Sequence, residues 1–308
     1  PPPPLFFFKQ TTAYAIGVRL VGSEMCIRDS SWDFHTVPNS ADEYGVDTWG
    51  NDSWRYSGNG NVWSMLAGDN ELGHVYLPTG TVTNDYVGVD RPGDNLFSES
   101  VIAVDVETGQ RQWHFQAVHH GLWDYDFPTH SNLVDITVDG RDIKALAQIS
   151  KQGFVYVFDR ETGDPVWPIE ERPVPQNSNM PGEVLSPTQP FPTKPDPFDY
   201  QGITVDDLVD FTPEIRAMAL EAVDGWRLGP LFTPLDLPVE GETKGTVMRP
   251  PPGGTAGWSG GAVDPETGIL YIPSHNQISV VEMYTPDPEL GATVPYTHGA
   301  DEALSLIH

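Results

Sequence analysis

The 308-residue sequence has one cysteine, Cys26, few basic residues and no long apolar run. A single cysteine cannot form an internal disulfide, so cysteine usage does not indicate a cellular compartment. No stretch of about 18 apolar residues is present, so the sequence contains no candidate transmembrane helix. Only 16 Lys and Arg accompany 44 Asp and Glu, which gives a formal net charge of −28. Such an acidic surface repels phosphates and anionic lipids, so nucleic acid and membrane surfaces are not expected as partners.

Glycine and proline are abundant instead, with 30 residues of each, irregularly placed along the chain. This composition is typical of many short strands joined by turns. The hydrophobic content of 38% argues against a disordered chain. A chain of this length can bury a substantial core, and β architectures of this size are often single domains. We therefore expect an all-β fold.

The two ends differ from the middle of the chain. Four prolines, Pro1–Pro4, precede an aromatic run, and the segment 6–30 resembles a translated sequencing adapter. The last residues, Leu304–His308, resemble the same kind of artefact. A signal peptide is the competing interpretation, but it fits poorly because the charged n-region and the small-residue cleavage site are missing. We expect residues 1–30 and 299–308 to be artefacts, which leaves a fragment spanning residues 31–298.

A tight turn followed by a tryptophan occurs twice with identical internal spacing. The copies are Asp105-x-x-Thr108-Gly109 with Trp113, and Asp159-x-x-Thr162-Gly163 with Trp167. The Asp side chain closes such a turn, and the glycine supplies a positive φ. The tryptophan is expected to project from the next strand into a neighbouring unit. Because Trp32 and Phe34 match Trp113 and Phe115, we expect a third, incomplete copy upstream.

Four-stranded units of about 40–55 residues with a fixed turn and a docking tryptophan predict a β-propeller. The alternative is a β-sandwich in which the turns coincide by chance. A related turn, Asp264–Gly268, precedes the run Ile269–Pro273. This turn and run match Asp69–Pro78 better than they match the Trp-ended copies.

Residues 170–245 are predicted to form a proline-rich insertion with a short helix. We expect the helical segment to occupy residues 204–222, with Thr212 as an N-cap before a proline at the first helical position. Its apolar stripe, which includes Ile215 and Met218, is expected to pack against the rest of the domain.

The densest group of chemically active side chains lies within residues 119–151. Asp124 and Asp126 alternate with aromatic residues, so on an extended strand the two carboxylates share one face. The Asp139-Gly140 dipeptide predicts a hairpin turn, which allows Lys151 to lie beside them on a neighbouring element. A solvated acidic strand end with a surface lysine is the alternative. His119 and His120 lack a third His or Cys at ligand spacing, so a transition-metal site is not expected.

Four segments of the chain resemble the pyrroloquinoline quinone (PQQ) dependent dehydrogenases. The similarity is greatest to quinoprotein glucose dehydrogenase and its relatives that act on sugars, polyols and cyclic hydroxy acids. The four segments are Trp113–Pro128, Ala147–Phe154, Trp167–Gln176 and Ser186–Pro195. The resemblance covers residues 31–298 and implies an eight-bladed β-propeller with PQQ on its axis, of which this chain holds about half the blades.

The resemblance assigns roles to individual residues. Asp124 matches the catalytic aspartate, and Lys151 matches the basic residue that contacts the quinone oxygens, at a spacing of 151 − 124 = 27 that agrees with the family. Trp63 matches the tryptophan that stacks on the PQQ plane. Thr81 or Thr83 stands where relatives place an Asn or Thr that contacts the metal or the cofactor.

Further expectations concern the surroundings of these residues. Trp258 is expected either to line the cofactor pocket or only to pack. Gly121 stands where some relatives carry Asp, so one supporting carboxylate is expected to be missing. Asp126 is expected to be a structural partner and not a second base. The upstream acidic metal ligand of the family has no counterpart in this sequence, so the metal ligands stay unknown.

The activity that the resemblance implies is oxidation of an alcohol or sugar hydroxyl. PQQ is the hydride acceptor, Ca²⁺ or Mg²⁺ is the Lewis acid, and Asp124 is the base. A quinone or cytochrome electron acceptor, a periplasmic location, and membrane attachment only through upstream segments are implied in the same way. The alternatives are a non-catalytic propeller that serves as a binding or assembly scaffold, and a glycosidase that uses Asp124 and Asp126.

Overall fold

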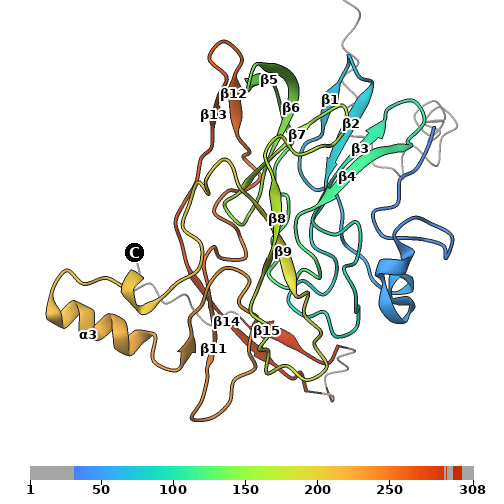
Figure 1. The fold of residues 1–308 in the computed structure, drawn as a ribbon. Helices are drawn as coiled ribbons and strands as arrows, with labels where there is room; N and C mark the ends of the chain where they lie inside the picture. The colour runs from blue at the N-terminus through green and yellow to red at the C-terminus, as the bar shows by residue number, and fades with distance from the viewer. Residues whose placement is uncertain (1–30, 288, 290–293, 300–308) are drawn as a thin grey trace, which may run out of the picture.

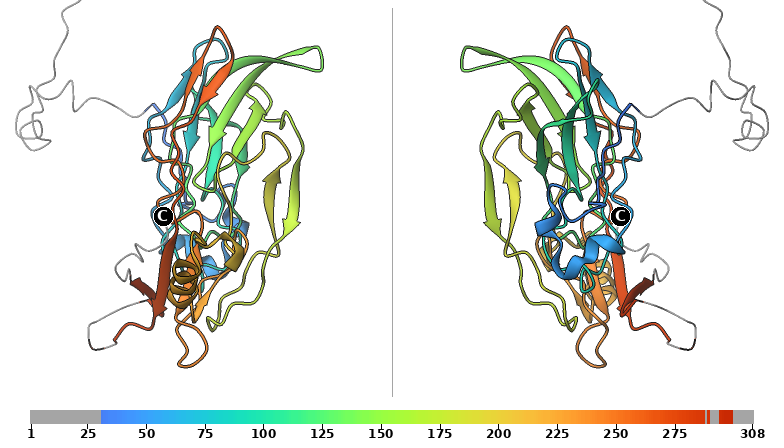
Figure 2. Two further views of the ribbon diagram at one scale, coloured as in Figure 1. Left: turned by 90° about the vertical axis from the view of Figure 1, so that its left-hand side faces the viewer. Right: turned by 90° about the vertical axis from the view of Figure 1, so that its right-hand side faces the viewer.

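The computed structural model describes residues 31–287, 289 and 294–299. The adapter-like segments 1–30 and 300–308, together with Cys26, lie outside these described residues. The described chain is built mainly of antiparallel β-sheets (Figures 1 and 2), as the sequence predicts. No helix within the described ranges is long and apolar enough to cross a membrane.

The first sheet is an antiparallel meander whose strands follow one another in sequence order. Its strands are β1 (Ala67–Asp69), β2 (His74–Pro78), β3 (Ser100–Asp105) and β4 (Arg111–Gln116). Strand β3 is buried on both faces, because Val101 and Ala103 pack in one hydrophobic cluster while Ile102 and Val104 pack in another. A four-stranded meander covered on both faces is the arrangement of a propeller blade.

The second sheet consists of β5 (Asn132–Val138), β6 (Arg141–Ile149) and β7 (Val155–Asp159). The expected Asp139-Gly140 turn joins β5 to β6, and both residues adopt a positive φ, of 51° and 77°. An isolated bridge between Phe158 and Pro165 continues this sheet beyond β7. The hairpin therefore carries the chain from the acidic segment to Lys151 as predicted.

The other elements are shorter. Two two-stranded sheets are formed by β8 (Ile169–Pro173) with β9 (Thr188–Pro192) and by β12 (Ala262–Asp264) with β13 (Ile269–Tyr271). A mixed sheet contains, in spatial order, β10 (Trp226–Arg227), β11 (Gly245–Met248), β14 (Ser279–Tyr284) and β15 (Thr297–Gly299). The helices are η2 (Val46–Thr48), η3 (Gly50–Arg55), η4 (Val205–Asp207) and α3 (Pro213–Ala222).

The tryptophan of one unit docks on the turn of the next. The Trp113 indole donates to the carbonyl of Arg160 at 3.1 Å, and Trp32 makes the same contact one unit earlier, to Val106 at 2.9 Å. A Cβ on Gly163 would lie 2.6 Å from the Trp113 ring, so the turn glycine leaves the space that the indole fills. The predicted repeat and its inter-unit docking are confirmed for these two copies.

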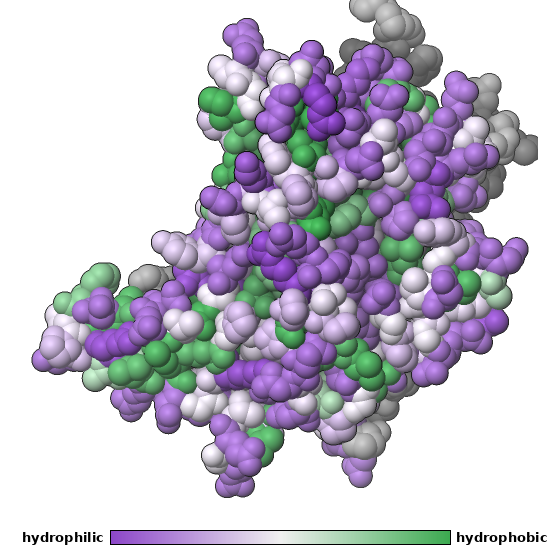
Figure 3. Space-filling model, viewed as in Figure 1, coloured by the Kyte–Doolittle hydropathy of each residue, from purple (hydrophilic) through white to green (hydrophobic). Residues whose placement is uncertain are grey.

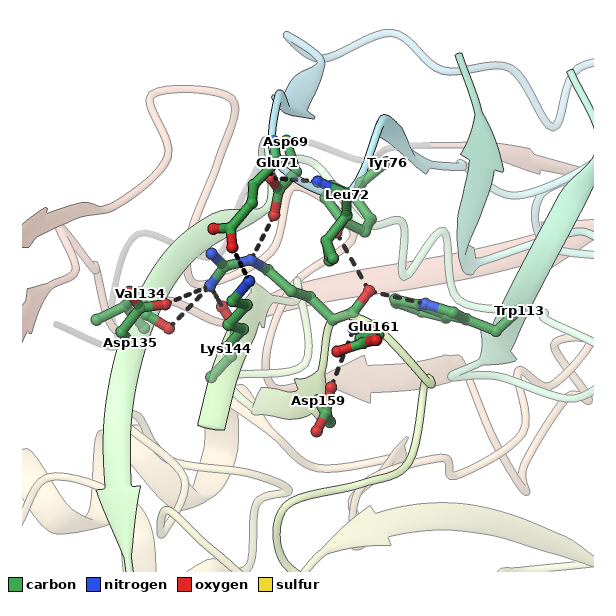
Figure 4. Close-up of polar contacts among 12 residues, drawn as sticks. Asp69, Glu71, Leu72, Tyr76, Trp113, Val134, Asp135, Lys144, Asp159 and Glu161 are labelled. Atoms are coloured by element: carbon green, nitrogen blue, oxygen red, sulfur yellow. Dashed lines mark hydrogen bonds and ion pairs between the residues drawn. The ribbon is translucent and has the colours of Figure 1, made fainter. Parts of the chain in front are cut away.

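Arg160 ties the first sheet to the second (Figure 4). Its guanidinium contacts Asp69 of the β1–β2 turn at 2.6 Å and Asp135 of β5 at 2.8 Å. Its carbonyl accepts from the Tyr76 hydroxyl at 3.2 Å as well as from Trp113. Since Arg160 and Asp69 are buried, their pairing is needed to offset the desolvation of both charges.

The β12–β13 hairpin repeats the β1–β2 hairpin in register. Ala262 pairs with Tyr271 as Ala67 pairs with Tyr76, and an aspartate closes each turn through hydrogen bonds from backbone N–H groups. The expected match between the two segments is therefore confirmed. Strand β12 also contacts β5, so the hairpin stands beside the second sheet (Figure 1).

The predicted helical segment is shorter than expected, and its apolar stripe packs only in part. The 3-10 helix η4 and the helix α3 are separate, and α3 begins after Thr212, whose hydroxyl caps the Ile215 N–H at 3.2 Å. Met218 is 57% exposed, and Ala219 is the buried residue of α3. Helix α3 extends away from the sheets, with apolar side chains along its visible surface (Figures 1 and 3). The packing expectation is confirmed for Ala219, which joins Val247 and Val280 in a buried cluster, and is wrong for Met218, which stays exposed.

Candidate active site

Three loops bring the predicted catalytic residues together. Asp124 and Asp126 lie in the segment between β4 and β5, Thr81 follows β2, and Lys151 lies in the turn between β6 and β7. The backbone fixes this meeting point, because the Lys151 N–H donates to the Asp126 carbonyl at 3.3 Å. Trp63 approaches from the segment that precedes β1.

Lys151 bridges both aspartates. Its ammonium nitrogen lies 3.0 Å from Asp124 Oδ2 and 2.8 Å from Asp126 Oδ2. Asp124 is not on a strand, as the alternation suggested, but in a loop with a φ of 55°. The two carboxylates face the same cation in spite of this difference. Lys151 is 5% exposed, so the alternative of a surface lysine beside a solvated strand end is wrong.

The two aspartates have different environments. Asp126 accepts from the Thr81 N–H at 2.5 Å, from the Thr81 hydroxyl at 3.0 Å and from the Trp63 indole at 3.2 Å. Asp124 pairs with Lys151, and the Asp124 side chain is 24% exposed. Asp126 is therefore held by the protein, whereas Asp124 keeps carboxylate lone pairs available to a ligand.

The charges of this cluster shift its pKa values. Burial, and after it the charge of Asp126, raise the pKa of Asp124 to about 7, although Lys151 lowers it. Burial opposes the charged form of Lys151, but Asp126 and Asp124 outweigh burial and raise the pKa of this lysine. Burial and the charge of Asp126 also raise the pKa of Asp85. A carboxyl that titrates near neutral pH beside a permanent cation suits a general base.

Trp63 presents an open aromatic face at this cluster. It is 42% exposed, and the Lys151 ammonium lies 5.9 Å from its ring centroid. A Cβ on Gly80 would lie 2.8 Å from Asp126 Oδ1 and 3.3 Å from the Trp63 indole nitrogen. The missing side chain at Gly80 therefore lets the tryptophan approach the aspartate. An anchored indole with one free face can stack on a planar ring.

Two of the predicted cofactor residues do not join the cluster. Thr83 is exposed, and its N–H donates to the Gly58 carbonyl. Trp258 is 73% exposed, and within the described residues it makes no hydrogen bond or ring contact with the aspartates or the lysine. The glycine-rich segment that contains Trp258 reaches the site instead at Gly254, where a Cβ would lie 2.5 Å from Lys151 Cγ.

Sequence reasoning missed three charged residues around the cluster, of which Glu99 and Arg91 are buried and Asp85 is half-buried. Glu99 is fully buried, and its carboxyl lies 3.1 Å from the Thr81 hydroxyl. Arg91, also fully buried, donates to the Gly121 carbonyl at 2.5 Å. Asp85 is the third. All three fall in the stretch that composition marks as a polar loop or strand start, so only their burial in the fold reveals them.

The donor chemistry of the site suits a hard divalent cation. Three carboxyls, those of Asp85, Asp124 and Asp126, and two cations, Lys151 and Arg91, influence one another, which leaves an excess of potential negative charge. Carboxylate and hydroxyl oxygens are the ligands that Ca²⁺ and Mg²⁺ prefer. No group of three or more His, Cys, Asp or Glu side chains in the described part of the chain is arranged to hold a metal. Asp124 and Asp126 therefore fit as part of a ligand set and not as a complete one.

Comparisons with known proteins agree with this geometry. Residues 29–303 match the family model described as glucose/ethanol/alcohol dehydrogenase, β-propeller domain, of the PQQ type. The chain is 34% identical over 232 residues to the glycerol dehydrogenase large subunit of Gluconobacter oxydans, covering 69% of this chain and 28% of that protein. It is 36% identical over 213 residues to the quinoprotein glucose dehydrogenase of Escherichia coli, covering 67% and 25%.

Solved structures show the same fold. A quinohemoprotein alcohol dehydrogenase of Pseudomonas putida HK5 superposes with a TM-score of 0.54 at 25% identity, covering 82% of this chain and 32% of that one. A europium-containing methanol dehydrogenase gives 0.53 at 24% identity, covering 81% and 35%. The chain thus spans about a third or less of the length of these relatives. The family model covers most of the chain, and this chain belongs to the PQQ-dependent dehydrogenase family as part of its β-propeller domain.

Proposed function

We propose that this chain contributes the catalytic base and part of the cofactor platform of a PQQ-dependent dehydrogenase that oxidises an alcohol or sugar hydroxyl. The observation that carries this proposal is the convergence of Asp124, Lys151 and Trp63 from three separate loops. A scaffold propeller needs no buried lysine between two carboxylates, because such a group costs desolvation energy without a ligand to serve. The glycosidase alternative is disfavoured, since Lys151 occupies the space between the two aspartates.

When bound, PQQ and a divalent cation, Ca²⁺ or Mg²⁺, supply the hydride acceptor and the Lewis acid of this reaction. Asp124 takes the proton of the substrate hydroxyl, because it is the partly exposed carboxyl of the pair. Lys151 holds Asp124 in place and offers positive charge to oxygens that gain electron density. Trp63 stacks on the cofactor plane, and Asp126 fixes both Trp63 and Lys151. The roles of Thr83 and Trp258 as cofactor contacts stay predictions.

The substrate, acceptor and location are part of the same proposal. The relatives described above are named for glycerol and glucose, which supports a small polyol or sugar as the substrate. We infer a quinone or cytochrome as the electron acceptor and a periplasmic site of action from family membership. We also infer that the domain is the propeller part of a longer protein, with any membrane attachment outside the described residues.

The test is the Asp124→Asn substitution in the complete protein. We expect PQQ-dependent dye reduction to fall by roughly 100-fold or more, because the amide cannot accept the proton. Cofactor binding, measured by equilibrium dialysis, should be retained. Asp139→Asn in the exposed β5–β6 turn is the matched control and should behave as the wild type. Unchanged dye reduction by the Asp124 variant would remove this residue from the mechanism and, with it, the proposed chemistry of the site.

A further inference from the structure

Glu99 is a fully buried acid next to the site that no expected role accounts for. It directly precedes β3, and its backbone is fixed on both sides. The Glu99 N–H donates to the Gly80 carbonyl at 3.2 Å, and its carbonyl accepts from the Ala117 N–H at 2.9 Å. Its φ of 47° is unusual for a residue with a side chain. Such a position is retained only where the surroundings hold the residue firmly.

The Glu99 carboxyl lies at the end of a short hydrogen-bonded chain. Glu99 Oε1 is 3.1 Å from the Thr81 hydroxyl oxygen, which in turn is 3.0 Å from Asp126 Oδ1. Glu99 Oε2 accepts from the Ser98 hydroxyl at 3.2 Å. The Thr81 hydroxyl has a single proton and stands between two carboxyl oxygens, so it can donate to only one of them.

The remaining contacts decide where the protons lie. Asp126 accepts from the Lys151 ammonium, from the Trp63 indole and from the Thr81 N–H, which is the pattern of an ionised acceptor. The Thr81 hydroxyl therefore donates to Asp126. Glu99 Oε1 can contact the Thr81 oxygen favourably only if the glutamic acid itself carries a proton and donates it.

We propose that Glu99 is a positioning residue, a neutral carboxylic acid that donates to Thr81 and thereby orients Asp126, Lys151 and Trp63. The proposal rests on the function proposed above for Asp124 and Lys151. It adds a buried proton to the site and assigns it to Glu99 Oε1. A fully satisfied chain of this kind rigidifies the groups that it connects.

The charged groups that face Glu99 are consistent with this assignment. Burial raises the pKa of Glu99 to about 8, and the charges of Asp126 and Asp124 add to the rise. The charge of Arg91 and the hydrogen bond with Thr81 lower the pKa of Glu99, but they do not prevail over burial. Glu99 thus keeps its proton at neutral pH.

Gly121 provides a second, independent observation. A Cβ at Gly121 would lie 1.8 Å from Glu99 Oε2, so the Glu99 carboxyl fills the space where a side chain at position 121 would begin. We expected a supporting carboxylate to be missing because Gly121 replaces an Asp of some relatives. Position 121 itself provides no carboxylate, but the Glu99 carboxyl enters the same volume from the start of β3.

The experiment compares three variants in the complete protein. Glu99→Gln preserves the shape, and its amide can donate to Thr81 and accept from Ser98, so we expect it to keep PQQ affinity and most of kcat/KM. Glu99→Ala breaks the chain and should lower kcat/KM by roughly 10-fold or more. Glu99→Ala combined with Gly121→Asp returns a carboxyl to the same volume and should recover part of that loss. Glu107→Gln, an exposed glutamate, is the control.

An infrared measurement reads the proton without any turnover. The wild type at neutral pH should show the carbonyl stretch of a protonated carboxyl, and the Glu99→Gln protein should lack it while Glu107→Gln retains it. Glu99→Gln losing activity as severely as Glu99→Ala, or no band lost on substitution, would overturn the proposal. If the wild type shows no PQQ-dependent activity at all, the proposed function fails, while the infrared result still decides the state of Glu99.

Discussion

Glu99 should make the protein less stable as the pH rises, and Glu99→Gln should remove that effect. Burial and the charge of Asp126 raise the pKa of Glu99 from 4.5 to about 8 in the folded protein. Between these two values the folded state keeps the proton while the unfolded state loses it. The free energy of unfolding therefore falls with rising pH through this window and levels off above it. The full difference, 8 − 4.5 = 3.5, corresponds to about 5 kcal/mol.

Other groups restrict the useful window. Asp124, whose pKa is raised from 3.8 to about 7 by burial and by Asp126, contributes in the same direction but only below about pH 7. His114, whose pKa burial lowers from 6.5 to about 4, has the opposite effect, and only between those values. Of these three groups, Glu99 therefore changes its protonation most between pH 7 and pH 8.

Urea denaturation at pH 7 and pH 8, followed by tryptophan fluorescence, measures this effect. The wild type should lose about 1 kcal/mol of unfolding free energy between the two values, whereas Glu99→Gln should lose little. Glu107→Gln should follow the wild type, because this side chain is exposed. If the free energy of unfolding changes equally with pH in the wild type and in Glu99→Gln, then Glu99 does not hold a proton in the folded protein.

Two further substitutions test the framework around the site. Arg160→Ala leaves Asp69 buried without its partner and should lower the free energy of unfolding, measured by urea denaturation, by about 3–5 kcal/mol. Adding Asp69→Asn removes the unpaired charge and should recover part of that loss. If nothing is recovered, the ion pair is not what joins the two sheets. Gly254→Ala places a Cβ 2.5 Å from Lys151 Cγ at a φ of 77°, so it should displace Lys151, weaken PQQ binding and cost about 1–3 kcal/mol. A Cβ on the neighbouring Gly253 meets open space, so Gly253→Ala should leave PQQ binding and stability unchanged. If the two variants behave equally, a clash with Lys151 does not explain the effect of Gly254→Ala.

The parts of the fold that the sequence predicts well are those fixed by local chemistry. The Asp-x-x-Thr-Gly turns close through their own side chains, as Asp105 shows by accepting from the Thr108 N–H and hydroxyl. The spacing from turn to tryptophan then places Trp113 on the next unit. The packing of α3 was not predictable in the same way, because amphipathic spacing does not say whether a partner surface is present.

The proximity of Asp124 and Lys151 was predictable for a similar reason. Asp124 and Lys151 are joined by a hairpin whose turn type is encoded by Asp139-Gly140. Their meeting depends on this one hairpin and on the register of β5 with β6. Trp258 shows the limit of such reasoning, because a tryptophan near glycines suggests a stacking surface, yet in the described structure Gly254 and not Trp258 reaches Lys151.

Glu99 could not be predicted from its own surroundings in the sequence. A Ser-Glu-Ser segment before a strand is ordinarily a solvated one, since glutamate is rarely buried. Its surroundings include Gly121 from the segment between β4 and β5, and Thr81 and Arg91 from earlier parts of the connection between β2 and β3. The one visible signal was the glycine at position 121, read as a lost carboxylate. A glycine in a charged site is better interpreted as vacated space, because close packing means that another side chain must fill it. Searching the neighbouring strands for an acid that could reach that space would have led to Glu99, and this is the reasoning that the Glu99→Ala, Gly121→Asp exchange puts to the test.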